Sequence, residues 1–310
     1  MTNRESGSFH SGPSSITVHA PAKINLILRI LDRRSDGYHN LWSVMQTVAL
    51  EDEVHIRVTS PGGIRLSCDT ELLPVDSSNL VYRAASAVLD QASLSIGLDV
   101  ELRKRIPMGA GLGGGSSDAA ATILGLNQLL KLGWSREQMQ SVAEQLGSDV
   151  PFFLFAPAAV VSGRGEAVKP VWMDESRWVV LAKPGFGVET KWAYQELAAT
   201  RADARPLSSV HQAIDRHSRL TWTQLATAAE NDFETLVFAR YPVLRDIKEA
   251  LRMQGAELAL LSGSGATMFG IFSTESAARR AQTHLAKDQR LQVFVVPTCS
   301  EPVTVSSCCH

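Results

Sequence analysis

The sequence predicts an α+β protein built from two domains. The chain has 310 residues, which is long enough for two hydrophobic cores. Strand-like alternation and helix-like spacing both occur along the chain, without the regular strand–helix order of a parallel barrel. We therefore expect a first domain over residues 15–170 and a second over 171–300, between disordered tails at 1–14 and 301–310.

The first domain opens with strands. Residues 15–31 predict one long strand or a strand pair, in which Lys23 and Asn25 share the face opposite a row of isoleucines and leucines. A polar segment over 32–40 contains an Asp-Gly pair and predicts a turn. Two further stretches alternate as antiparallel strands do, at residues 52–58 and 63–68.

Helices and strands then follow in turn. A helix with serine at its start is expected over 76–92, and a strand over 97–107. Beyond a glycine-rich loop, Ser116 is expected to cap a helix that ends at Gly133. A capping box at residues 135–138 starts the next helix.

The second domain mixes both kinds of element. Helices are expected at residues 190–197, 220–232, 241–255 and 276–285. Strands are expected from Trp178 onward, on both sides of a second glycine loop within 256–272, and at 291–298. The elements again lack a parallel βα order, which favours α+β for this half as well.

Composition excludes several classes of protein. The formal net charge of −2 indicates no sequence-wide basic field for nucleic acid or a membrane surface, and nothing points to a protein partner. The most apolar stretch, residues 150–161, is shorter than the ~20 residues that cross a bilayer, so it predicts a buried strand. The N-terminus lacks an apolar signal core. The cysteines show no metal-finger spacing and favour reduced thiols in the cytoplasm: Cys68, Cys299, Cys308 and Cys309.

The strongest local signal is the loop "MGAGLGGGSSDAA" at residues 108–120. It holds five glycines within seven positions. Each glycine costs roughly 0.5–1 kcal/mol more than alanine to order, so a plain connector would not use five. Close approach of the backbone to a ligand explains them, and the helix behind them presents free N–H groups and a positive dipole end. The loop therefore predicts an anion site, most simply for phosphate, to which Ser116 and Ser117 add hydroxyls.

Other glycine loops fit less well. A Walker loop requires a lysine that this loop lacks. Gly109, Gly111 and Gly114 match a dinucleotide fingerprint formally, but the chain offers no acidic strand end at the expected distance. The companion motifs of a protein kinase are absent from the sequence. A flexible linker is the remaining, purely structural, alternative.

Three motifs together resemble the GHMP kinases, which are ATP-dependent kinases of small alcohols and phosphates. They are "APAKINLIL" at 20–28, "PMGAGLGGGSSDAA" at 107–120 and "LSGSGATMFGIF" at 261–272. Further stretches, "DGYHNL", "GSDVPFFL" and "NDFE", are similar to the branch of the family whose alcohol substrate carries a cytidine diphosphate group. Together the similarities run from about residue 20 to residue 297. Asp118 after the two serines, and Trp42 after "HNL", depart from the usual pattern.

The resemblance implies a two-domain GHMP kinase fold. Its N-terminal domain resembles ribosomal protein S5 domain 2, and its C-terminal domain is ferredoxin-like, with the active site between them. ATP is the implied co-substrate, and Mg²⁺ is expected with its phosphates, although the sequence does not reveal the metal ligands. The triphosphate is expected on a continuous stretch: Pro107, Met108, Gly109, Ala110, Gly111, Leu112, Gly113, Gly114, Gly115, Ser116 and Ser117.

The same resemblance assigns catalytic roles to Asp149 and Lys23. Asp149 matches the family's catalytic aspartate and would accept the proton of the alcohol or orient its hydroxyl. Lys23 would hold Asp149 ionised and stabilise charge in the transition state. Without the resemblance, Asp149 would be taken for a turn residue and Lys23 for an edge lysine.

Substrate binding is expected from five other positions and Asn25. Tyr38 and His39 would stack on a cytosine ring and read its edge. Thr190 matches a substrate-side threonine, and the amides at Gly263 and Ser264 would bind the diphosphate. Two alternatives stay open: a GHMP kinase for another small alcohol, and a catalytically silent protein that senses nucleotide.

Overall fold

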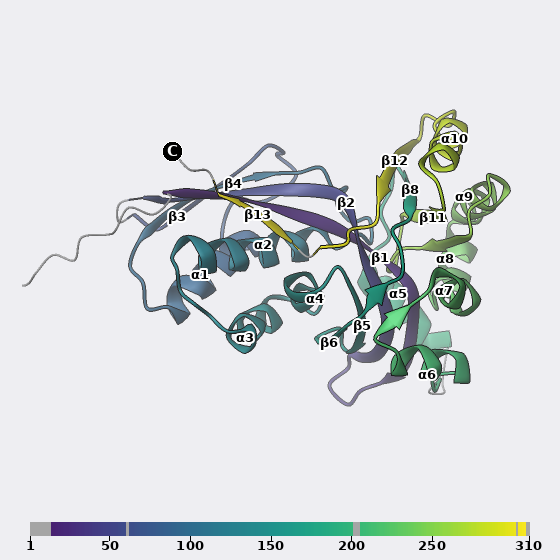
Figure 1. Ribbon diagram of the computed structural model, residues 1–310, viewed down its shortest axis with the longest axis horizontal. Helices are drawn as coiled ribbons and strands as arrows, with labels where there is room; N and C mark the ends of the chain where they lie inside the picture. Colours follow the sequence, from purple (N-terminus) through teal and green to yellow (C-terminus); the bar gives the residue numbers. More distant parts are fainter. Residues whose placement is uncertain (1–13, 60–61, 201–204, 302, 308–310) are drawn as a thin grey trace, which may run out of the picture.

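The computed structural model describes residues 14–59, 62–200, 205–301 and 303–307. Figure 1 shows two large sheets, each covered by helices, and the long strands β1 and β2 of one of them run through most of the molecule. The predicted two-domain α+β fold is confirmed. The predicted N-terminal tail lies outside the described residues except for Ser14.

The first sheet has seven strands, and β1 and β2 form its centre. Their bounds are β1 (Ser15–Arg33), β2 (His39–Thr59), β3 (Ile64–Cys68), β4 (Gly97–Arg103), β5 (Ala158–Gly163), β6 (Ala167–Pro170) and β13 (Thr304–Ser307). β5 pairs with the first half of β2, and β4 pairs with its second half, so the sheet divides along one strand. Bulges in β1, including one between Asn25 and Ile27, bend the β1–β2 pair where the site lies.

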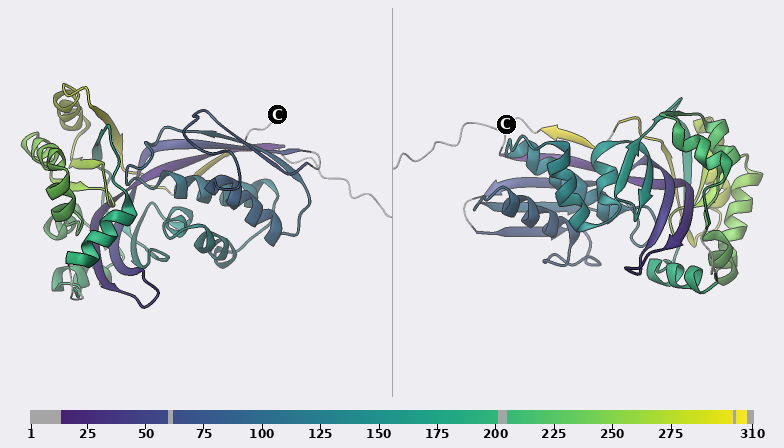
Figure 2. Two further views of the ribbon diagram at one scale, coloured as in Figure 1. Left: turned by 180° about the vertical axis from the view of Figure 1, so that it is seen from behind. Right: turned by 90° about the horizontal axis from the view of Figure 1, so that it is seen from below.

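Four helices cover one face of this sheet, as both views in Figure 2 show. They are α1 (Leu80–Gln91), α2 (Gly114–Leu129), α3 (Arg136–Leu146) and α4 (Val150–Phe155). α2 lies directly on β1, and small residues let it do so. A Cβ at Gly125 would come within 2.8 Å of Cγ2 of Val18. This close contact packs the C-terminal half of α2 against the first residues of β1.

The second sheet is antiparallel, in the order β10–β11–β8–β12. Its strands are β8 (Trp178–Pro184), β10 (Leu258–Leu261), β11 (Met268–Phe272) and β12 (Leu291–Pro297). Helices α9 (Pro242–Met253) and α10 (Glu275–Leu285) pack against it. The remaining elements are α5 (Thr190–Thr200), α6 (Ser209–Arg216), α7 (Trp222–Ala228), α8 (Glu234–Arg240), β7 (Trp172–Met173) and β9 (Arg219–Leu220). β7 and β9 pair with each other in parallel as a small third sheet. The strands of the two large sheets divide near residue 170, with β13 as the exception.

Two predicted strands are corrected. The stretch predicted as one buried strand begins as helix α4, and only Ala158–Gly163 is a strand. Every side chain from Val150 to Leu154 is buried, so no periodicity distinguishes the two states, and Pro151 fits the first helical turn without losing a hydrogen bond. β3 pairs with β4 in parallel, where the alternation suggested antiparallel pairing.

Helix ends and the C-terminal tail differ as well. α2 begins at Gly114 with Gly113 as its N-cap, two residues before Ser116, and it ends at Leu129, before Gly133. Asn79, and not a serine, caps α1. The capping box of Ser135 and Gln138 is present as predicted. Part of the tail predicted as disordered forms β13, because its backbone can pair with the free edge of β1.

Candidate active site

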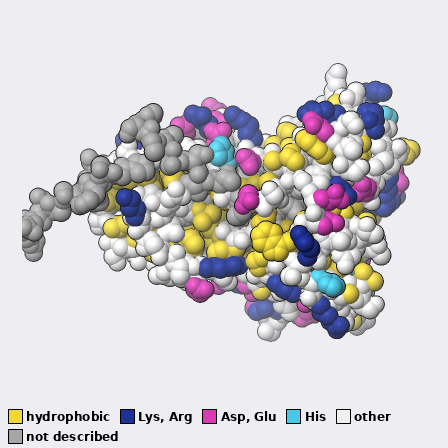
Figure 3. All heavy atoms as spheres, viewed as in Figure 1, with side chains coloured by type: hydrophobic (Ala, Val, Ile, Leu, Met, Phe, Trp, Pro, Cys, Tyr) yellow, Lys and Arg dark blue, Asp and Glu magenta, His cyan; other side chains and the backbone are white. Residues whose placement is uncertain are grey.

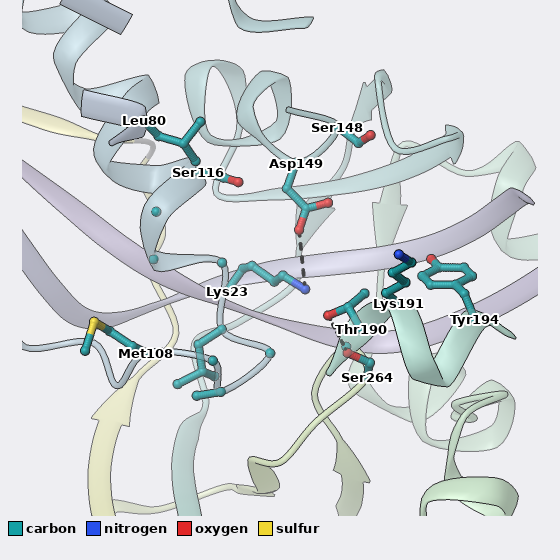
Figure 4. Close-up of a pocket in the computed structure, with 18 of the residues that line it drawn as sticks. Lys23, Leu80, Met108, Ser116, Ser148, Asp149, Thr190, Lys191, Tyr194 and Ser264 are labelled. Carbon is teal, nitrogen blue, oxygen red and sulfur yellow. Dashed lines mark hydrogen bonds and ion pairs between the residues drawn. The ribbon is translucent and has the colours of Figure 1, made fainter. Parts of the chain in front are cut away.

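A pocket of about 1270 Å³ lies between the domains. β1, the first glycine loop, the start of α4, α5 and the second glycine loop line it (Figure 4). All the predicted site residues line this pocket except Ser117. The side chain of Ser117 is fully buried in α2 and its backbone N–H donates to the carbonyl of Gly113 at 2.9 Å, so its hydroxyl does not face the pocket.

The first glycine loop leads directly into the free N-terminus of α2. Gly113 has a φ of 72°, and a Cβ there would lie 3.0 Å from Cγ of Lys23 and 3.0 Å from Cζ of Phe153. Within the described chain no side chain caps this helix. Its first N–H groups and dipole are therefore free to bind an anion in the pocket.

The two glycine loops are packed against each other. Gly111 has a φ of 77°, and a Cβ there would lie only 2.1 Å from the carbonyl oxygen of Ser262. Two hydrogen bonds join the loops: Ser262 Oγ donates to the carbonyl of Gly111 at 2.9 Å, and Thr267 N–H to that of Ala110 at 3.2 Å. The relative position of the domains at the pocket is thus held by backbone contact.

Lys23 and Asp149 point toward each other across the pocket (Figure 4). Lys23 Nζ lies 3.7 Å from Asp149 Oδ2 and donates to Asn25 Oδ1 at 2.7 Å. Burial lowers the pKa of Lys23, and the nearby charge of Asp149 opposes that effect. The Lys23 side chain is almost completely buried, while that of Asp149 is about one-third exposed. A buried cation thus stands beside a carboxylate that substrate can reach.

Asn25 connects this pair to both sheets of the site. Its Nδ2 donates to Ser43 Oγ at 2.9 Å, and its Oδ1 accepts from the N–H of Gly263 at 3.0 Å. The Gly263 N–H is therefore not free to bind the diphosphate as predicted from the sequence. Nearby, the hydroxyls of Thr190 and Ser264 are hydrogen-bonded at 2.9 Å. These contacts bring residues from both domains to one wall of the pocket.

Aromatic side chains gather beyond that wall. Tyr38 is 59% exposed, and the Arg164 guanidinium lies 5.3 Å from its ring centroid. The rings of His39 and Tyr194 lie 5.3 Å apart. Burial, together with the charge of Asp149, raises the pKa of Tyr194, so its phenol stays neutral. Tyr194 was not predicted from the sequence, although it follows Thr190 by one helical turn and so shares its face of α5.

A buried charged cluster lies beneath the start of α2 and was also missed. Lys104 Nζ contacts Asp52 and lies 2.6 Å from Asp118 Oδ2. Burial raises the pKa of Asp118 to about 8, with Lys104 opposing and Asp52 adding to the shift. A Cβ at Gly114 would lie 3.3 Å from Lys104 Nζ, so the cluster directly supports the glycine loop.

Leu80 and Met108 lie at the opposite end of the pocket (Figure 4), and the apolar side chains of Leu73 and Leu102 also line the pocket. The pocket thus has an apolar end and an aromatic, polar end, with Lys23 and Asp149 between them. In the part of the chain that the structure describes, no group of three or more His, Cys, Asp or Glu residues could hold a metal ion. Nor is any described helix long and apolar enough to cross a membrane.

Comparison with known proteins identifies the family. The sequence patterns described as "GHMP kinases N terminal domain" and "GHMP kinases C terminal" match residues 79–156 and 210–290. The 4-diphosphocytidyl-2-C-methyl-D-erythritol kinase of Citrifermentans bemidjiense is 41% identical over 86% of this chain and 93% of its own length. That of Heliobacterium modesticaldum is 41% identical over 90% and 94%.

Solved structures agree with the sequences. A crystal structure of 4-(cytidine 5'-diphospho)-2C-methyl-D-erythritol kinase superposes with a TM-score of 0.76 and 33% identity, covering 92% of this chain and all of its own. A homoserine kinase from Cytophaga hutchinsonii shares the fold, with a TM-score of 0.73 at 20% identity over 97% of this chain and all of its own. The chain belongs to the GHMP kinase family.

Proposed function

We propose that this GHMP kinase transfers the γ-phosphoryl group of ATP to the 2-hydroxyl of 4-diphosphocytidyl-2-C-methyl-D-erythritol, in the non-mevalonate route to isoprenoid precursors. The observation that carries the proposal is the buried Lys23 beside Asp149, between the free N-terminus of α2 and an aromatic end of the pocket. The names of the relatives, at 41% identity over most of the chain, support the same substrate.

In the proposed complex the triphosphate of ATP lies along the first glycine loop, with its adenine at the apolar end. Mg²⁺ would neutralise the phosphates, and the oxygens of Ser116 and Asp149, which border the same pocket, suit its preference for oxygen donors. Because three-carboxylate sites are absent from the described residues, the nucleotide would supply most of the ligands.

In the proposed reaction the substrate hydroxyl lies between Asp149 and the γ-phosphorus. Asp149 accepts the hydroxyl proton while the oxygen forms a bond to phosphorus and the bond to the β-phosphate breaks, releasing ADP. Lys23 stabilises the charge that develops on the transferred group. The ammonium is held by Asn25 at 2.7 Å, so it is oriented before substrate binds.

The cytidine end would bind at the other side of this pair. Tyr38 presents an exposed ring for stacking, and Tyr194 and His39 form a second aromatic surface. Thr190 and Ser264 supply hydroxyls for the diphosphate. Both signs of charge are interspersed on the face shown in Figure 3, which suits recognition by a specific pocket more than by a general electrostatic field. A cytoplasmic location stays a prediction.

Turnover measurements test the proposal. Asp149→Asn and Lys23→Met are expected to keep the wild-type Tm and to lower kcat by about 10²–10⁴-fold, the usual worth of such groups. Lys287→Met and Asp288→Asn, the same changes in adjacent residues between α10 and β12, are the matched controls. Near wild-type kcat in either active-site variant contradicts its role.

The acceptor is identified by ADP release with several alcohols. The cytidine-bearing substrate is expected to react, and methylerythritol analogues without cytidine, mevalonate and homoserine are not. Equal turnover without cytidine would replace the proposed substrate with another small alcohol. ATP binding without turnover of any alcohol would favour a nucleotide sensor.

A further inference from the structure

The segment "NDFE", residues 231–234, contributes Phe233 to the lining of the active-site pocket, while Asn231 lies outside that lining. It joins α7 to α8 on the far side of the second glycine loop, residues 262–267. We propose that Asn231 is a positioning residue that holds this loop against Lys23 and thereby sets kcat without touching substrate. The inference rests on the proposed function only for the identity of the reaction.

Both the nitrogen and the oxygen of the Asn231 side-chain amide form hydrogen bonds. Its Nδ2 donates to the carbonyl of Leu261 at 2.7 Å and to that of Gly263 at 2.8 Å. Its Oδ1 accepts from the N–H of Phe233 at 2.9 Å. Since Asn231 is only 6% exposed, water does not replace these bonds without opening the structure.

Gly263 connects Asn231 to the catalytic pair. While its carbonyl accepts from Asn231, its N–H donates to Asn25 Oδ1 at 3.0 Å. The same Oδ1 accepts from Lys23 Nζ at 2.7 Å. A Cβ at Gly263 would lie 3.5 Å from Lys23 Nζ, so the loop backbone stands directly beside the ammonium.

Asn231 is itself anchored to the strand that carries Lys23. Leu28 N–H donates to the carbonyl of Glu230 at 2.8 Å, and Asp232 N–H donates to that of Leu28 at 3.0 Å. Ile30 N–H donates to Asp232 Oδ2 at 2.7 Å. The contacts form a closed ring that runs from β1 through Asn25, Gly263 and Asn231 back to β1.

Glu234 supports the same ring from the next turn. Its Oε1 accepts from the N–H of Leu261 at 2.9 Å, and its Oε2 contacts Lys248. The end of β10 is therefore held at both its N–H and its carbonyl. The position of Gly263 relative to Lys23 follows from these anchors, since Gly263 lies two residues beyond Leu261.

Asn231→Asp is the informative change because it keeps the size of the side chain. It places a carboxylate oxygen against two carbonyl oxygens and removes both donated hydrogen bonds. We expect Gly263 to withdraw from Asn25, and kcat to fall about ten- to a hundredfold, as a misplacement near 1 Å can cost about 10²-fold. The KM for ATP is expected to change less than kcat, because adenine lies at the opposite end of the pocket.

Asn127→Asp is the matched control. Asn127 lies near the far end of α2, and its Oδ1 accepts from Trp134 N–H at 3.0 Å. Asn127→Asp keeps this accepted bond and loses only the weak donation from Nδ2 to Met139 Sδ at 3.5 Å, so we expect a smaller loss of Tm than in Asn231→Asp and a kcat at the wild-type value. A double-mutant cycle of Asn231→Asp with Asn25→Ala is expected to be non-additive, with a double loss close to the larger single loss.

Two results would overturn the inference. One is a kcat of Asn231→Asp within twofold of wild type, measured well below the Tm of the variant. The other is a double mutant whose loss of kcat equals the product of the losses in Asn231→Asp and Asn25→Ala. The kcat ratio is taken with whichever alcohol the wild type phosphorylates. Hydrogen exchange of the Gly263 amide, expected to be protected in wild type and exposed in Asn231→Asp, needs no substrate. Failure of the proposed substrate therefore leaves this test readable.

Discussion

Replacing Gly111 by alanine tests whether the contact between the two glycine loops holds the domains together. Alanine at a φ of 77° costs roughly 1–2 kcal/mol by itself. Its Cβ would also stand 2.1 Å from the carbonyl oxygen of Ser262, a backbone atom that cannot rotate away. The loops must separate, and the bonds of Ser262 to Gly111 and of Thr267 to Ala110 break.

Both lost hydrogen bonds are buried, since Ser262 and Thr267 are completely inaccessible. Each is worth about 0.5–1.5 kcal/mol, which adds about 1–3 kcal/mol to the backbone cost. Gly109→Ala is the control, because Gly109 has a φ of 59° but a Cβ there meets no described heavy atom within 4 Å. Gly109→Ala therefore loses only the free energy needed to place alanine at a positive φ.

The assay is thermal unfolding of both variants without nucleotide, so that ligand binding does not contribute. One kcal/mol shifts the Tm of a chain of this size by roughly 2 °C, so Gly111→Ala is expected to melt about 2–6 °C below Gly109→Ala. Equal Tm values for the two variants would refute the reasoning, because both share the backbone cost and only one breaks the loop contact.

Three further results are expected. Tyr38→Ala should raise the KM for the cytidine-bearing substrate about 5–150-fold, by loss of 1–3 kcal/mol of stacking, and leave the KM for ATP unchanged; a similar rise in Tyr38→Phe would argue against stacking. Asp118 has its pKa raised from 3.8 to about 8, so it contributes stability that is present below pH 3.8 and is lost as the pH rises to about 8. Asp118→Asn should flatten the dependence of unfolding free energy on pH over that window, and an unchanged slope would exclude this group. Thr190→Val removes the 2.9 Å hydrogen bond to Ser264 and should raise the substrate KM with little change in Tm, whereas an unchanged KM would place the diphosphate elsewhere.

The sequence was informative where the physics is local. Lys23 and Asn25 were expected on one face of a strand, and the 2.7 Å hydrogen bond between their side chains follows from that alternation. The capping box of Ser135 and Gln138 spans four residues and needs no tertiary partner. The glycine loop before α2 was likewise recognisable, because positive φ angles leave a clear compositional trace.

Other features could not be predicted because they depend on tertiary contacts. The apolar stretch that forms α4 carries no period, so its helical state depended on packing under α2 and α3. β13 became a strand because an edge of β1 was free to receive it, which its polar sequence does not reveal. In the sequence Asp118 is only a small departure from a family motif. The structure shows that it lies in a buried cluster with Lys104 and Asp52.

The sequence by itself predicted the fold class and the glycine loop, because spacing along a helix, strand or turn encodes them, while the side chains proposed for the chemistry came from its resemblance to the GHMP kinases. Only the tertiary structure decided how these groups are held. Gly263 and Asn25 are 238 residues apart in the chain, yet the backbone nitrogen of Gly263 lies 3.0 Å from Oδ1 of Asn25. The positions of Tyr194 and Asn231 likewise depend on contacts with residues that are distant in the chain. Contacts of this kind depend on how two domains pack, and packing leaves no period in the chain from which it can be predicted.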